Sequence, residues 1–460
     1  MALHPALMTT TERAAVPVHL VAPADLGTWR DAQPVATRQW LEAVGATPRA
    51  GTWTALPGTD GALAGVLIQG AAADLYALAP LALALPAGTP LRLATPVDVA
   101  TQTRLALGFA LGAYQYTRYR PVLARSPAQL QVSAGVAAEV TRLAAAVGFA
   151  RDLVHTPTED CGPDELQTVI EALAATHGGT VRSIVGDALL AERFPAIHAV
   201  GRASHRAPRL IELDWGDPAH PAVTLVGKGV CFDTGGLDVK PADGMLWMKK
   251  DMGGAAVAIA LARLVMERGL KLRLKLLVPA VENAIGPNAY RPGEVIQTRA
   301  GFRVEIGNTD AEGRVILCDA LSYAAEAKPA LLIDFATLTG AARIALGPDL
   351  PATFSNRDGL SDALIHAGRR VADPLWPMPL PPEYQRYLDS PIADFNNAGA
   401  TRMGGAITAA LYLQRFVPDS VAWAHLDTYC WNDADRPGRP RGGECQGLRA
   451  ADALLTARYG

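Results

Sequence analysis

Lysine is scarce in this chain of 460 residues. Of the 42 basic residues only seven are lysine, and none of these precedes residue 228. Four of them, Lys228, Lys240, Lys249 and Lys250, fall in one short segment. Lysine can serve as a neutral amine ligand or as a compact ammonium, and arginine can do neither, so a site that requires one of these groups would explain the cluster. Chance clustering of charges on a solvated surface is the other explanation.

The sequence also lacks paired cysteines, a long apolar run and a strong net charge, and each of these absences disfavours a class of protein. The five cysteines form no C-x-x-C pair, which argues against a disulfide scaffold or a zinc ribbon. The most apolar run, residues 77–87, contains two prolines and is too short to cross a bilayer. The start of the chain has no basic region followed by an apolar core, so no secretory signal is expected. With a formal net charge of −3 there is no electrostatic case for nucleic acid or membrane partners, and we expect a cytoplasmic protein.

The length suggests roughly two or three domains. Residues 1–131 alternate short apolar runs with helical patterns, and they predict a smaller N-terminal α/β domain whose specific role is unclear. Residues 132–155 predict a connecting helix that ends before Pro157, because the residue preceding a proline is disfavoured in the α conformation. Residues 156–460 form the expected larger domain.

In the larger domain, apolar strand patterns alternate with helical patterns. This alternation predicts an α/β fold with a mainly parallel central sheet covered by helices on both faces. Ligands of such sheets bind at the carboxyl ends of the strands. The predicted strands are 223–230, 270–281, 304–307, 331–336 and 421–426, and the predicted helices are 253–268, 315–327, 405–416 and 448–458.

Charged residues in two distant segments follow these predicted strands. They are Lys228, Asp233, Lys240 and Asp251 in the first segment, and Asp310, Glu312 and Arg314 in the second. Carboxylates with a neutralisable lysine make a mostly oxygen-donor site for two divalent cations, which is a common design for hydrolysing amide and phosphate bonds.

Each of these acids also has a purely structural interpretation. Asp251 could cap the helix that begins at Gly253, and Asp310 could form an Asx turn.

If the backbone between Asp310 and Glu312 is extended, their side chains share one face, because the two residues are two positions apart. Lys249 and Lys250 are interpreted as ordinary flanking charges, and Cys231 and Cys318 as small buried hydrophobic residues.

Six motifs closely resemble the leucyl aminopeptidase (cytosol aminopeptidase) family of dinuclear metallo-exopeptidases. The resemblance covers about residues 150–460, and N-T-D-A-E-G-R is its most specific signature. The motifs are G-K-G-V-C-F-D-T-G-G-L-D-V-K-P, M-K-K-D-M-G-G-A-A, Y-R-P-G-E-V, N-T-D-A-E-G-R-V-I-L-C-D-A-L, D-F-A-T-L-T-G-A, and G-G-A-I-T-A-A-L followed by W-A-H-L-D.

The resemblance implies a ligand set for two metal ions, Zn²⁺ or Mn²⁺. Lys228, Asp233, Asp251 and Glu312 would hold the tighter ion, and Asp233, Glu312 and Asp310 the more exchangeable one. Lys228 could bind a metal only as the neutral amine, a state that two nearby dications favour. The metal pair would activate a water that attacks the peptide bond.

The resemblance also implies roles for the remaining residues. Lys240 would stabilise the oxyanion of the scissile carbonyl, and Arg314 would hold a bicarbonate that acts as general base. Peptides with leucine-like N-terminal residues would be the substrates, and the assembly would be a homohexamer. The first side chain of the substrate would contact Met248, Asn308, Ala311, Thr337 and Gly340.

The chain departs from the usual family pattern in two motifs. Glu294 stands where aspartate is usual, and the bulkier run 428–432 borders the expected cleft, which puts the specificity in doubt. A binding or regulatory protein that keeps this scaffold, for example one that also binds DNA, is the alternative function. Its basic stretch would be Arg436–Arg441, a Pro- and Gly-rich segment expected to be a surface loop. A phosphate-binding loop at Gly227–Gly229 lacks the required spacing.

Overall fold

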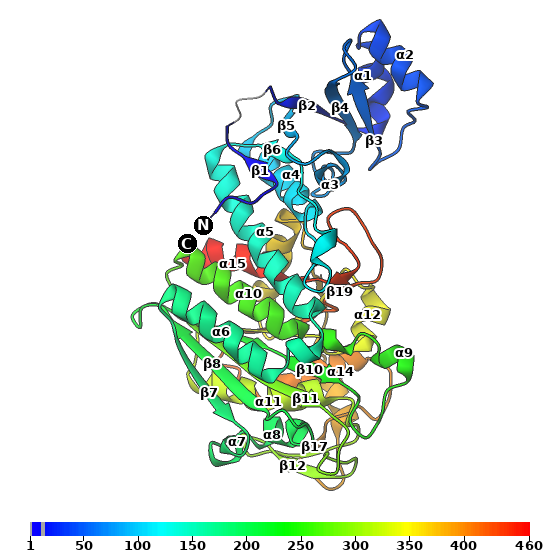
Figure 1. The fold of residues 1–460 in the computed structure, drawn as a ribbon. Coiled ribbons are helices and arrows are strands. Elements are labelled where there is room, and N and C mark those ends of the chain that lie inside the picture. Colours follow the sequence, from blue (N-terminus) through cyan, green and yellow to red (C-terminus); the bar gives the residue numbers. More distant parts are fainter. Residues whose placement is uncertain (1, 11–13) are drawn as a thin grey trace. The chain divides into compact units, whose positions relative to one another are not determined.

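The computed structural model describes residues 2–10 and 14–460, and these form two compact units (Figure 1). The first runs to Gly148 and includes Ala434–Arg441, and the second comprises Phe149–Asp433 and Gly442–Gly460. The division falls inside the long helix α5 (Ala134–His155). The domain limits 1–131, 132–155 and 156–460 therefore stay a prediction. Residues 1 and 11–13, which belong to the first of these ranges, lie outside the described residues.

The first unit is built on a six-stranded sheet. Its strand order is β1-β6-β5-β2-β4-β3, and every neighbouring pair is parallel except β3 with β4. The Asp98 side chain caps helix α4 by accepting a bond of 2.8 Å from the Thr101 N–H. The elements are β1 Leu7–Met8, β2 Val16–Val21, β3 Trp53–Pro57, β4 Leu63–Gln69, β5 Pro90–Leu93, β6 Gln129–Gln131, α1 Leu26–Asp31, α2 Val35–Ala43, α3 Leu81–Ala84 and α4 Val99–Gly112.

The second unit contains the predicted mainly parallel sheet. Its strand order is β16-β15-β18-β14-β9-β11-β8-β7, with β10 paired to β11. The central strands β18, β14, β9 and β11 are parallel; β8 is antiparallel to β11, β7 is antiparallel to β8, and β15 is antiparallel to β18. The strands are β7 Thr180–Val185, β8 Arg209–Trp215, β9 Ala222–Gly227, β10 Gly229–Asp233, β11 Arg273–Asn283, β14 Leu331–Ala336, β15 Ala352–Ser355, β16 Trp376–Pro377 and β18 Trp423–Asp427.

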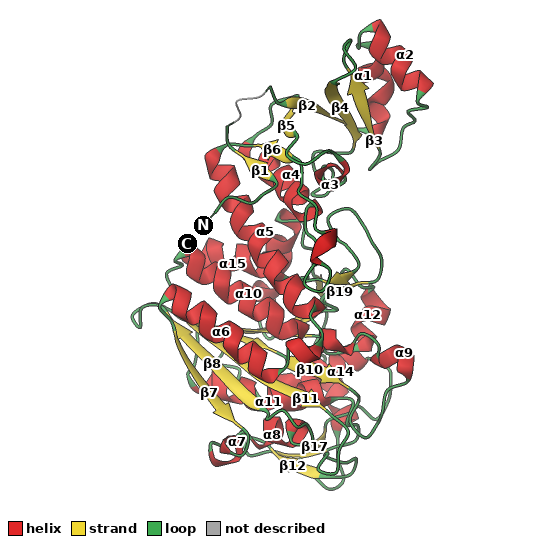
Figure 2. Ribbon diagram, in the orientation of Figure 1, coloured by secondary structure: helices red, strands yellow, loops and turns green. Residues whose placement is uncertain are grey.

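Helices cover both faces of this sheet, as Figure 2 shows. Helices α6, α10 and α15 pack on one face, and α8, α11 and α14 group on the other. The helices are α6 Pro163–His177, α7 Ala188–Ala191, α8 Pro195–Gly201, α9 Ala242–Met245, α10 Gly253–Arg268, α11 Glu312–Glu326, α12 Gly340–Leu346, α13 Asp358–Arg370, α14 Gly405–Gln414 and α15 Leu448–Tyr459. Small sheets complete the unit, with strands β12 Val295–Gln297, β13 Arg303–Glu305, β17 Phe395–Asn396, β19 Trp431–Asn432 and β20 Gly442–Gly443.

The core of the second unit lies between the sheet and these helices. Helix α10, predicted at 253–268, is buried along nearly all of its length, as is α11. Cys231 and Cys318 are fully buried, as predicted, and the other three cysteines are buried as well. Burial raises the pKa of both thiols well above the usual value, which fits a packing role. None of the described helices is long and apolar enough to span a bilayer.

Three local predictions are wrong, and all three concern the charged segments. The single strand expected at 223–230 is divided into β9 and β10 on either side of Lys228. Helix α11 begins at Glu312, three residues earlier than predicted, so the backbone from Asp310 to Glu312 is a turn rather than an extended strand. Asp251 does not cap α10, whose preceding residue is Met252; it lies in a 3₁₀ helix, Met248–Met252.

Candidate active site

The carboxyl ends of the parallel strands place the charged residues at one edge of the sheet. Strand β10 ends at Asp233, β14 leads into Thr337, and Lys228 lies in the break between β9 and β10. Asp310 and Glu312 arrive at the start of α11, which packs against β9, β11 and β14. Parallel strands end together, so residues far apart in the sequence meet at this edge.

Lys228 is surrounded by oxygen atoms. Its Nζ atom lies 2.7 Å from Asp251 Oδ2 and 2.8 Å from Glu312 Oε1, and it donates a hydrogen bond of 2.8 Å to the Thr337 carbonyl. Burial acts to lower the Lys228 pKa, but the carboxylates of Asp251, Glu312 and Asp233 outweigh it and raise the pKa above its usual value. Lysine therefore sits here as the partner of buried acids and not as a solvated surface charge.

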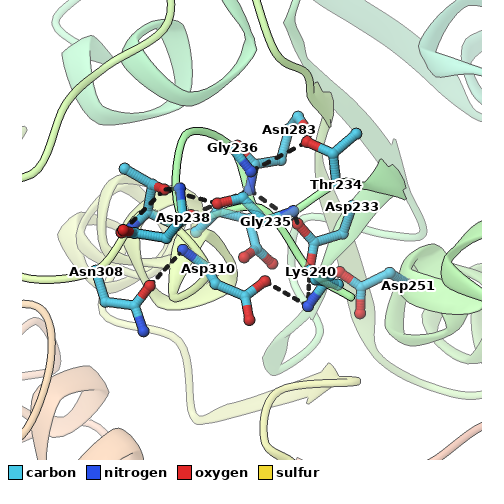
Figure 3. Close-up of polar contacts among 12 residues, drawn as sticks. Asp233, Thr234, Gly235, Gly236, Asp238, Lys240, Asp251, Asn283, Asn308 and Asp310 are labelled. Carbon is cyan, nitrogen blue, oxygen red and sulfur yellow. Dashed lines mark hydrogen bonds and ion pairs between the residues drawn. The ribbon is translucent and has the colours of Figure 1, made fainter. Parts of the chain in front are cut away.

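A second lysine joins two further acids across the site (Figure 3). Lys240 Nζ lies 2.8 Å from Asp233 Oδ2 and forms a second, shorter ion pair with Asp310. Burial opposes the positive charge of Lys240, but Asp233, Glu312 and Asp310 raise its pKa nonetheless. Both segments predicted from the sequence thus converge on one cluster of charges.

Three acids in this cluster are close enough to share a cation. Asp233, Asp310 and Glu312 each offer one oxygen, and these oxygens lie within 4.8 Å of one another. Burial and repulsion from Asp233 raise the pKa of Asp310 to about 6 and that of Glu312 to about 8. Oε2 of Glu312 is buried with no hydrogen-bond partner among the described residues. An acceptor left in this state fits coordination of a divalent cation.

Several supporting residues were not found by sequence reasoning. The Asn283 amide donates to Asp233 Oδ1 at 2.8 Å and to the Thr309 carbonyl at 3.0 Å, so it links the two acid segments. The Thr309 hydroxyl donates to the Gly235 carbonyl at 2.6 Å, and the Thr309 N–H donates to Asp238 Oδ2 at 2.8 Å. Asp238 and Thr309 lie within the quoted motifs, whereas Asn283 is the last residue of β11 and lies beyond the strand predicted at 270–281.

The Asx turn expected at Asp310 belongs to its neighbour. The Asn308 side-chain oxygen accepts a bond of 2.8 Å from the Asp310 N–H, which leaves the Asp310 carboxylate directed at Lys240 (Figure 3). The Asn397 side chain supports the same turn by donating to the Asn308 carbonyl at 2.8 Å.

A cavity of about 440 Å³ opens onto the charged cluster. Nine of the twelve residues singled out from the sequence line it, namely Lys228, Asp233, Lys240, Met248, Asp251, Asp310, Glu312, Thr337 and Gly340. Asn308, Ala311 and Arg314 are not among its lining residues. The cavity walls also include Lys250, Arg343, Asp427 and Tyr429.

Arg314 follows the cluster by half a turn of α11. Its guanidinium is buried, and Nη1 donates a bond of 2.8 Å to the Asn397 carbonyl. Its Nε atom has no hydrogen-bond partner within the described ranges, and burial lowers the pKa of the group. The Nε–H of Arg314 is therefore a buried donor that no acceptor among the described residues satisfies.

Two family descriptions match almost the whole chain. The one named "Cytosol aminopeptidase family, catalytic domain" matches residues 148–451, and "M17 aminopeptidase, N-terminal domain" matches residues 16–132. The chain belongs to the cytosol aminopeptidase family. It is therefore a peptidase, and the mixed α/β fold predicted from the sequence is the fold of this family.

Individual relatives and solved structures are similar to this chain over most of their length. A probable cytosol aminopeptidase of Caulobacter vibrioides is 40% identical over 382 residues, which are 79% of this chain and 76% of that protein. The crystal structure of a cytosol aminopeptidase from Coxiella burnetii has a TM-score of 0.94 and 48% identity, covering 99% of this chain and all of that one. The bottromycin maturation enzyme BotP, solved in complex with Mn, has a TM-score of 0.86 and 34% identity over 97% of this chain and 100% of its own.

Proposed function

We propose that this cytosol aminopeptidase releases N-terminal amino acids, preferably leucine-like, from peptides with the help of two divalent metal ions. The observation that carries the proposal is the group of Asp233, Asp310 and Glu312 oxygens within 4.8 Å, beside the buried Lys228 and the partly buried Lys240. This much negative charge in a half-enclosed cavity needs cations, and two ions sharing carboxylates suit amide hydrolysis.

The proposed donors for the two ions all belong to the charged cluster. Lys228, Asp233, Asp251 and Glu312 would hold one ion, and Asp233, Asp310 and Glu312 the other. The ions, Zn²⁺ or Mn²⁺, would supply Lewis acidity and lower the pKa of a water molecule. Binding must deprotonate the Lys228 ammonium, which now neutralises Asp251 and Glu312. The presence of Mn in the BotP complex supports the choice of a divalent ion.

Lys240 and Arg314 would act on the substrate side of the reaction. Lys240 is only partly buried and lines the cavity, so its ammonium can reach a peptide carbonyl and stabilise the negative charge that develops on it. Arg314 offers an unsatisfied buried donor for a bicarbonate, which would take the proton from the attacking water. No histidine lines the cavity within the described part of the chain, so an external base is chemically reasonable.

The preference for leucine-like residues rests on the remaining walls. Met248, Thr337 and Gly340 line the cavity, and Asn308 and Ala311 belong to the turn that carries Asp310. Such a pocket discriminates by only ~1 to 3 kcal/mol per methylene. A homohexamer located in the cytoplasm is part of the same proposal and is supported by the family assignment alone.

An activity assay tests the proposal. The purified full-length chain, incubated with Mn²⁺ or Zn²⁺, should hydrolyse leucine p-nitroanilide, and chelation should abolish the activity. A metal-loaded protein that cleaves no aminoacyl substrate would contradict it. DNA binding is not favoured, since Arg439 of the basic stretch lies over the Tyr76 ring, 4.7 Å from its centroid, within the first unit.

A further inference from the structure

Lys250 does not behave as the ordinary flanking charge that the sequence suggested. Only 6% of the residue is exposed, and it lines the cavity of the active site. Its neighbour Lys249 points elsewhere, donating to the His155 carbonyl at 2.5 Å. Two consecutive lysines therefore have different surroundings, and only Lys250 faces the substrate cavity.

The ammonium of Lys250 lacks an anionic partner. Across residues 2–10 and 14–460, no hydrogen bond or ion pair reaches its Nζ atom, whereas Lys228 and Lys240 each contact two carboxylates. Its close polar contact is the face of Tyr429, whose ring centroid lies 4.8 Å away. A ring face compensates a buried cation only in part, because burying an unpaired charge is costly.

A second cation shares the same aromatic ring. Arg343, on helix α12, lies 4.7 Å from the Tyr429 centroid, lines the cavity and has no salt bridge in the described part of the chain. The Tyr429 hydroxyl is 3.0 Å from Asp433 Oδ1, a contact that fixes the ring. The cavity thus has a positive wall formed by Lys250 and Arg343, which both contact the Tyr429 ring.

Asp427 and Asp243 also line the cavity, but among the described residues neither forms an ion pair with Lys250 or Arg343, and both accept hydrogen bonds from other groups. Asp427 accepts bonds from the Leu338 N–H at 3.0 Å and from the Thr339 hydroxyl at 2.6 Å. Asp243 accepts from the Gly244 N–H at 2.9 Å. A group that enters the cavity with a negative charge is the remaining partner.

We propose that Lys250, together with Arg343, forms a subsite for a carboxylate of the peptide substrate. The inference rests on the aminopeptidase activity proposed above and adds a preference to it. The carboxylate could belong to an acidic first residue, to an acidic second residue or to the C-terminus of a dipeptide, which all present the same chemistry. A charge-assisted contact with a buried cation favours such a substrate by roughly 10-fold or more over its uncharged counterpart.

Three matched substrate pairs identify the source of the carboxylate. They are Glu-p-nitroanilide with Gln-p-nitroanilide, Leu-Asp-amide with Leu-Asn-amide, and Leu-Leu with Leu-Leu-amide. For the metal-loaded full-length enzyme, kcat/KM should favour the charged member by about 10-fold or more in at least one pair. If leucine p-nitroanilide is hydrolysed but no pair shows a preference, the subsite inference is wrong and the aminopeptidase proposal stands.

Variants then assign the preference to the positive wall. Lys250→Met should reduce the charged-to-neutral ratio of kcat/KM to near one, while Lys250→Arg should keep most of it. Lys249→Met removes the same charge from the adjacent position and should leave the ratio unchanged. If Lys250→Met does not fold, Arg343→Met, at an exposed residue, should lower the ratio several-fold. A ratio that survives both Lys250→Met and Arg343→Met would overturn the inference.

Discussion

Lys228 packs directly against Gly313. A Cβ atom added to Gly313 would stand 2.6 Å from Lys228 Cε and 2.8 Å from Nζ, closer than nonbonded atoms approach. Gly313 is the second residue of α11, immediately after Glu312, one of the carboxylates that Lys228 contacts. The glycine of N-T-D-A-E-G-R is therefore required by the position of the lysine.

Replacing Gly313 by alanine should displace Lys228 and weaken the metal site. Because Lys228 also contacts Asp251, we expect metal affinity or kcat/KM to fall roughly 10- to 100-fold, as for other changes next to a metal ligand. Titration of bound metal and kinetics with leucine p-nitroanilide measure the effect. Gly359→Ala is the control, since its added Cβ would meet nothing within 4 Å. Equal activity in the two variants would show that the contact is unimportant.

Lys228→Arg should abolish activity although the charge is kept. A guanidinium is too large for a site closed by Gly313, and it cannot become a neutral ligand. We expect kcat/KM to fall by more than about 100-fold, the upper end of losses for residues outside the ligand set. Metal analysis and kinetics together provide the test, with the exposed Lys271→Arg as control. Near-normal turnover of Lys228→Arg would refute the neutral-ligand role.

Lys240→Ala should separate catalysis from metal binding. Lys240 contacts Asp233 and Asp310, and it lines the cavity. Its replacement removes the ammonium from the cavity, whereas the two carboxylates, which come from other positions in the chain, stay in place. We expect full metal content and a kcat lowered by about 10²- to 10³-fold, as for other losses of oxyanion stabilisation. Loss of metal in step with loss of activity would instead assign Lys240 a structural role.

His155 should make the fold sensitive to acid. Its Nδ1 atom accepts a bond of 3.2 Å from the Gly443 N–H, and burial together with Lys249 lowers the pKa of the ring to about 4. In the unfolded chain the same ring binds a proton near pH 6.5. Neutral His155 therefore contributes fully to the free energy of unfolding above pH 6.5, and this contribution is lost as the pH falls toward 4. Because the ring is partly exposed, the loss should be only about 1 to 2 kcal/mol.

Urea unfolding of the wild type and of His155→Gln between pH 7 and pH 4 measures this contribution. The difference in unfolding free energy between the two proteins should narrow as the pH falls. A difference that is constant across this range would mean that His155 does not titrate during unfolding.

Much of the large unit could be predicted from local sequence. Helix α10 at 253–268 and strand β14 at 331–336 lie where their patterns placed them, since buried segments with a clear period leave little choice of structure. The break of the strand at Lys228 was missed. At this break the Lys228 side chain contacts Asp251 and Glu312, and such contacts with other segments leave no mark on the local apolar pattern.

The sequence by itself determined the family and the fold class, and it singled out the charged residues that the structure brings into one cluster, because their types and spacing within the motifs are specific. Only the tertiary structure decided which lysines are paired. Lys228 and Lys240 meet carboxylates from distant segments, whereas Lys250 meets the ring of Tyr429 and the open cavity. The partner of a buried charge depends on how segments far apart in the chain pack together, and local sequence patterns do not predict this packing.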